Sequence, residues 1–89
     1  GMGYSQHIKA AGADGLAGNW EVTTKQDTIS ISIAKDLRIS GGKIKGTAEV
    51  IDGGSIKLVG VLEEAVTLKA ERGKLVGVMK GGKVEMRKT

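Results

Sequence analysis

Three groups of side chains in this 89-residue sequence belong to types that catalyse reactions or bind metal ions. The only histidine, His7, is a candidate base or metal ligand. Glu63 and Glu64 are adjacent carboxylates and a candidate acid–base pair. The hydroxyls of residues 23–32, a segment rich in Thr and Ser, are candidate nucleophiles.

The spacing of these residues argues against each of these chemistries. No cysteine or second histidine is present to complete a metal site with His7. Adjacent strand residues point to opposite faces, so Glu63 and Glu64 cannot converge on one substrate if the strand persists there. If the chain turns a corner at these two residues, their charges would keep an edge strand soluble. The hydroxyls have no histidine base in the predicted folded region, so we expect no enzyme activity, no metal and no cofactor.

Composition and charge also restrict the partners. Residues 43–89 carry ten basic and six acidic side chains, which account for the whole net charge of +4. These lysines alternate with apolar residues and with glutamates, as on a solvated strand face. Single-strand nucleic-acid binders and sugar sites stack their ligands on aromatic faces, and only Tyr4 and Trp20 are available here. We therefore expect no nucleic-acid partner, and no apolar run approaches the ~18 residues that span a bilayer.

The chain divides into a short first segment and one β domain. Residues 1–15 are rich in Gly, Ala and Ser and predict a tail or linker, and residues 16–89 show the period of two that is typical of strands. Thr28 to Ile33 alternates hydroxyl and isoleucine throughout, and Leu37–Ile39 is expected to continue this strand past a bulge. The predicted strands are 19–25, 28–33, 43–51, 55–62, 65–71, 74–79 and 83–88.

The connections between these strands are short and rich in glycine. Gly-Gly pairs lie at 41–42, 53–54 and 81–82. Connections of two to four residues cannot carry a crossover helix, so neighbouring strands must be antiparallel. The fold class is therefore all-β, an antiparallel up-and-down meander of about seven short strands that closes into a small barrel or half-barrel. Gly46, Gly60 and Gly77 fall inside predicted strands, where we expect sharp bends or close backbone approach.

The motif Gly18-Asn19-Trp20 in the first strand, followed by the meander and by Arg87 in the last strand, resembles the calycin pattern of lipocalins and avidin-like proteins. In that family the Gly-x-Trp motif closes one barrel end and a late arginine packs over the indole. The resemblance therefore implies that Trp20 and Arg87 form a structural pair at a barrel end, or contact a small apolar ligand there. Similar small bacterial domains of unknown function occur in exported proteins, which implies a periplasmic or secreted location. The chain departs from larger lipocalins in its fewer and shorter strands and in its lack of cysteine.

The sequence Leu-Val-Gly-Val occurs twice, at residues 58–61 and 75–78, and each copy places apolar residues on both faces of its predicted strand. If the leucines and glycines point inward, four valines point outward, namely Val59, Val61, Val76 and Val78. Contiguous exposed apolar surface commonly marks an interface. A second copy, residues 4–11 or an upstream domain would cover it, unless the strands form a sandwich in which both faces are internal.

Two functions remain as expectations. The first is a non-catalytic interaction module that associates through these valines with itself or with an upstream domain. The alternative is a small-molecule carrier that uses the barrel end near Trp20.

Overall fold

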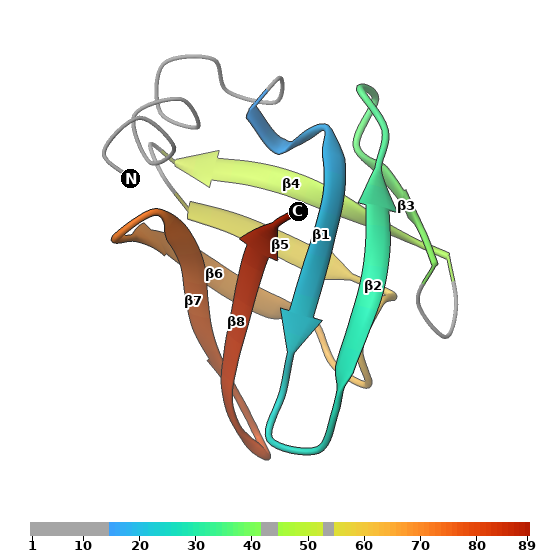
Figure 1. Ribbon diagram of the computed structural model, residues 1–89. Coiled ribbons are helices and arrows are strands. Elements are labelled where there is room, and N and C mark those ends of the chain that lie inside the picture. The colour runs from blue at the N-terminus through green and yellow to red at the C-terminus, as the bar shows by residue number, and fades with distance from the viewer. Residues whose placement is uncertain (1–14, 42–44, 53–54) are drawn as a thin grey trace.

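The computed structural model describes residues 15–41, 45–52 and 55–89, and these form an all-β antiparallel meander. Eight strands follow one another around a small closed barrel, and β1 pairs with both β2 and β8 (Figure 1). The strands are β1 (Gly18–Thr23), β2 (Thr28–Ile33), β3 (Arg38–Ser40), β4 (Gly46–Asp52), β5 (Ser55–Val59), β6 (Val66–Glu71), β7 (Lys74–Met79) and β8 (Gly82–Lys88). The predicted fold class is confirmed, and of the two predicted forms, barrel and half-barrel, the structure shows the closed barrel.

The strand count differs from the sequence prediction by one. The chain does not continue past a bulge after β2 but turns back, so that β3 pairs antiparallel with β2. Leu37 adopts a positive φ of 69°, and its backbone N–H donates to the carbonyl of Ala34 at 2.9 Å. A non-glycine residue in this conformation is uncommon, so leucine at this position does not signal a turn.

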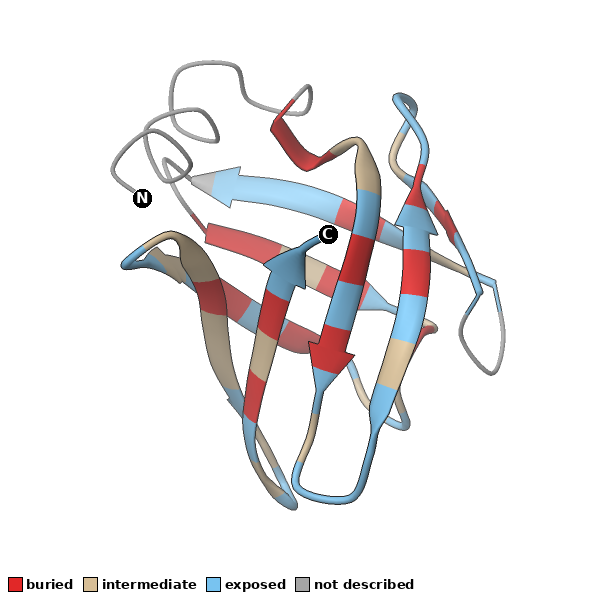
Figure 2. Ribbon diagram, in the orientation of Figure 1, coloured by how far each residue is buried: buried red, intermediate tan, exposed pale blue. Residues whose placement is uncertain are grey.

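The core is aliphatic and follows the alternation of the strands. Along β1 and β2, buried and exposed residues alternate in Figure 2, with Trp20 and Val22 facing inward from β1. Ile31 and Ile33 face inward from β2, and the hydroxyl residues Thr28, Ser30 and Ser32 face outward. Within the described residues, no helix is long and apolar enough to cross a membrane.

One barrel end is filled by its own side chains. Gly15 and Leu16 form a short 3₁₀ turn before β1, and Leu16 is completely buried. The indole of Trp20, 1% exposed, donates from Nε1 to the carbonyl oxygen of Leu16 at 2.8 Å. This hydrogen bond satisfies a buried donor and ties the entry segment to the first strand. Gly15, which was assigned to the tail, is therefore part of the folded end.

Gly77 and Gly60, two of the three glycines predicted to lie inside strands, differ from each other in the structure. Gly77 lies in β7, and a Cβ there would stand 2.3 Å from the backbone oxygen of Thr67, so the predicted close approach is confirmed. Gly60 does not lie inside a strand, because β5 ends at Val59 and Gly60 has a φ of 87°. Its positive φ interrupts the alternation and changes which of the following residues face the core.

The outer wall carries charges of both signs. Lys74 of β7 donates from Nζ to Glu85 of β8 at 2.6 Å, and this contact holds the pKa of Glu85 below its ordinary value. Lys57 stands across from Glu49 in the register of β4 and β5. These two pairs place basic and acidic side chains next to one another on the outer wall.

The backbone conformation of the β6–β7 turn predicts how a substitution of Arg72 changes stability. Its two-residue loop, Arg72 and Gly73, has positive φ at both positions, 52° and 84°, as a type I′ turn requires. Asparagine tolerates this conformation better than arginine, so Arg72→Asn is expected to stabilise the protein by about 1 kcal/mol. Thermal unfolding should show a rise in Tm of about 4–8 °C. Arg72→Ala removes the same charge without the gain, and an equal rise in both variants would contradict the assignment.

Candidate binding mouth of the barrel

The other end of the barrel is open. In an up-and-down barrel the first, third, fifth and seventh connections meet at one end, and in Figure 1 the β1–β2 and β7–β8 turns lie at the bottom. Residues 24–27, 61–64 and 80–81 of three connections surround a pocket of about 470 Å³, which we call the mouth. This volume lies within the ~300–1,000 Å³ range of small-molecule sites.

The floor of the mouth is aliphatic. Ile29 of β2, Val61 and Leu62 of the β5–β6 connection, and Met79 of β7 line it. Val61 is buried, and the other three are partly buried against the core. These side chains offer apolar surface that a ligand can cover, because the barrel's own side chains do not fill this end.

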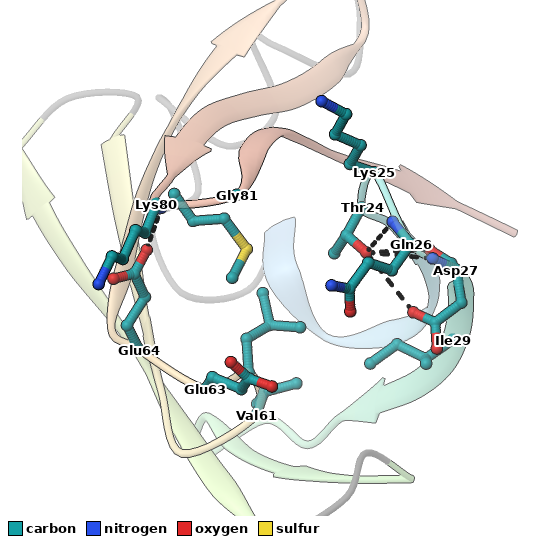
Figure 3. A pocket seen from close by; sticks show the side chains of 12 residues that line it. Thr24, Lys25, Gln26, Asp27, Ile29, Val61, Glu63, Glu64, Lys80 and Gly81 are labelled. Carbon is teal, nitrogen blue, oxygen red and sulfur yellow. Dashed lines mark hydrogen bonds between the residues drawn. The ribbon is translucent and has the colours of Figure 1, made fainter.

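The β1–β2 part of the rim is ordered by a threonine. The backbone N–H of Thr24 donates to the carbonyl of Asp27 at 2.8 Å. In return, the Thr24 hydroxyl oxygen accepts hydrogen bonds from the backbone N–H groups of Gln26, at 3.2 Å, and of Asp27, at 3.3 Å (Figure 3). Such hydroxyl-to-backbone bonds fix a tight turn without glycine. The turn thereby places Gln26 at the opening.

The opposite part of the rim is tied together by a carboxylate. The backbone N–H of Lys80, in the β7–β8 turn, donates to Oε1 of Glu64 in the β5–β6 connection, as the dashed line in Figure 3 shows. This contact joins segments 16 residues apart in sequence. The two connections therefore form one wall of the mouth.

In the described ranges, no three or more His, Cys, Asp or Glu residues lie close enough to hold a metal ion. His7 lies outside the described residues. The carboxyls with a lowered pKa are Asp36, through its hydrogen bond to the backbone of Arg38, and Glu85, and neither lines the mouth.

Trp20 and Arg87, which were predicted to pair at one barrel end, lie on opposite faces of the barrel wall. Trp20 faces the core, whereas Arg87 is exposed on the outer face of β8, across from Glu21. Val84 and Met86 occupy the inward positions of β8, so strand alternation turns Arg87 away from the indole. Lys88 is the residue in register with Trp20, and its Nζ reaches the carbonyl of Gly15 at 3.5 Å.

The four valines predicted to face outward do not form one patch. Val61 is only 1% exposed and belongs to the core, because the positive φ of Gly60 reverses the alternation after Val59. Val59 and Val78 are exposed and Val76 is partly buried. Strand β6 separates β5 from β7, so Val59 lies apart from Val76 and Val78.

Sequence reasoning missed the mouth. It placed the ligand-binding alternative near Trp20, at the end that the structure shows to be filled. A signal was present in the connection between β5 and β6, which at residues 60–65 is longer than the two-residue loop between β6 and β7. Glu63 and Glu64 lie on this connection and line the mouth together with Met79.

Comparison with known proteins does not assign the chain to a family. No protein-family model, no curated protein and no solved structure matches this sequence. The class that the structure itself defines is a small, eight-stranded antiparallel β-barrel with one filled end and one open mouth.

Proposed function

We propose that this protein is a non-catalytic binding module that holds a small molecule with an apolar body in the mouth of the barrel. The observation that carries the proposal is the contrast between the two ends. Trp20 and Leu16 fill one end, whereas Ile29, Leu62 and Met79 leave an aliphatic floor at the other. An eight-stranded barrel has room for its own side chains or for one small ligand, and this one divides its interior between the two.

The rim supports this function as well. Hydrogen bonds donated by backbone N–H groups to the Thr24 hydroxyl order the β1–β2 turn, and the Glu64 carboxylate joins the other two connections. A rim ordered before binding reduces the entropy that a ligand must overcome, so useful affinity is within reach of a pocket this small.

A neutral apolar probe, 1-octanol, tests the proposal. Met79→Gln replaces part of the floor with a polar group and is expected to raise the Kd for octanol at least fivefold, since about 1 kcal/mol of apolar contact is lost. The matched control is Val78→Gln, at the neighbouring position on the outer face of β7, which should leave the Kd unchanged. Equal effects in both variants, or no octanol binding to the unaltered protein, would refute the proposal.

The family relationship belongs to the same proposal. The eight-stranded meander and the Gly18-Asn19-Trp20 motif support a small relative of lipocalin-like barrels, and the outward position of Arg87 departs from that pattern. An exported bacterial protein fits this relationship. Fractionation of the source cells tests it, because recovery from the cytoplasm alone would contradict export.

Self-association is a second candidate function, and it is supported by one feature of the outer wall. The Val78 side chain is 77% exposed and follows the partly buried Val76 on the same face of β7. Covering these valines would favour a contact between copies. We expect Val78→Lys to lower the mass seen by sedimentation at high concentration, with Ser32→Lys on the exposed face of β2 as the control. A protein that remains monomeric at every concentration would exclude this candidate.

A further inference from the structure

The ionisable side chains around the mouth differ in whether they are available to bind a ligand. Five ionisable side chains line it: Lys25, Asp27, Glu63, Glu64 and Lys80. The carboxylate of Glu64 already accepts a hydrogen bond from the backbone of Lys80, and that of Asp27 accepts one from the Thr24 hydroxyl. In Figure 3 the side chains of Lys25 and Lys80 point away from the opening.

Glu63 and Gln26 remain as the polar groups that reach toward the middle of the opening, from the β5–β6 connection and the β1–β2 turn respectively (Figure 3). The Glu63 carboxylate makes no hydrogen bond or ion pair with any residue that the structure describes. A carboxylate only accepts hydrogen bonds, and an amide side chain offers an accepting carbonyl as well. The mouth therefore provides accepting groups above an aliphatic floor.

We propose that the ligand is a small cationic amphiphile, an aliphatic amine whose apolar chain covers Ile29, Leu62 and Met79 and whose ammonium group meets Glu63 and Gln26. This inference rests on the proposed function and specifies its ligand class. An ammonium group donates three hydrogen bonds and carries the charge that Glu63 attracts. A carboxylate head at the same place faces Glu63 as a like charge.

Three probes of equal chain length separate the head group from the apolar body. Octylamine, 1-octanol and octanoate are titrated against the protein at neutral pH and low salt, below the concentrations at which they aggregate. An exposed charge pair changes affinity a few-fold, so attraction for the amine and repulsion of the acid together predict about a tenfold difference between them. Octylamine is expected to bind most tightly, octanol less tightly and octanoate most weakly. Added salt should reduce the difference in affinity between the amine and the acid.

Substitution of Glu63 locates the effect. Glu63→Gln keeps the shape of the side chain and removes its charge, and it should bring the three affinities within about twofold of one another. Glu49→Gln makes the same charge change on the exposed outer wall of β4 and should preserve the order. Because Glu63 is exposed, neither variant is expected to unfold the protein.

The outcomes distinguish this inference from the function on which it rests. Equal binding of all three probes, tighter binding of octanoate, or an order that survives in Glu63→Gln would overturn the amine assignment and leave the apolar mouth standing. Failure of all three probes to bind would overturn both.

Discussion

Replacing Gly77 with alanine is expected to lower the free energy of unfolding by about 3 kcal/mol, the upper part of the range for overpacked positions. The added Cβ would stand 2.3 Å from the Thr67 carbonyl oxygen and 3.2 Å from Cγ of Leu68. The first of these atoms is backbone and cannot rotate away. Strands β6 and β7 would have to separate, although Leu68 and Gly77 are paired in register. For a domain of this size, the Tm should fall by roughly 15 °C.

The chain offers a matched control for this substitution. Gly81, in the β7–β8 turn, has no heavy atom within 4 Å of an added Cβ and no positive φ. Gly81→Ala should therefore change the unfolding free energy by less than about 0.5 kcal/mol. If denaturant unfolding shows the Gly77 variant to be as stable as the Gly81 variant, β6 and β7 do not approach as closely as described.

Removing the indole of Trp20 is expected to have an effect of similar or larger size. Trp20→Ala leaves a large cavity beneath Leu16 and should cost about 3–5 kcal/mol. That is a large share of the roughly 4–13 kcal/mol expected for a domain of this length. The physical reason is specific to this chain, because among the described residues Trp20 is the one aromatic side chain in an otherwise aliphatic core.

A second variant separates the hydrogen bond from the volume. Trp20→Phe keeps an apolar ring but leaves the buried Leu16 carbonyl without its indole donor, and it should cost about 1–3 kcal/mol. It also keeps the test usable if Trp20→Ala does not fold. Urea unfolding followed by circular dichroism measures both variants, and a phenylalanine variant as stable as the original protein would show that the Leu16 cap does not depend on the indole.

Much of the fold could be predicted because its signals are local. The alternation from Thr28 to Ile33 identified β2 with its observed bounds, and the glycine turns identified the meander. The missed strand, β3, follows a turn in which Leu37 has a positive φ, and leucine gives no sign of that conformation. Its three residues are also too few to show a period.

The binding site could be predicted less well, because it depends on which face of a strand each residue occupies and on contacts between residues that are not adjacent in sequence. One residue in a left-handed conformation, Gly60, moved Val61 from the outer face to the core. The alternation of Val84 and Met86 already placed Arg87 on the outside, but the resemblance to lipocalins favoured an inward arginine. Which end of the barrel is filled depends on how Leu16 caps Trp20, and no short sequence pattern encodes that contact.

The most direct test of the central claim is an NMR titration with 1-octanol that follows backbone amides and the Trp20 indole N–H in one spectrum. The account predicts that the amides of Gln26, Leu62 and Met79 shift in a saturable manner, while the Trp20 indole signal stays in place. A shift of the indole with unchanged signals from the mouth would contradict it, because the ligand would then enter at the end that Leu16 and Trp20 fill.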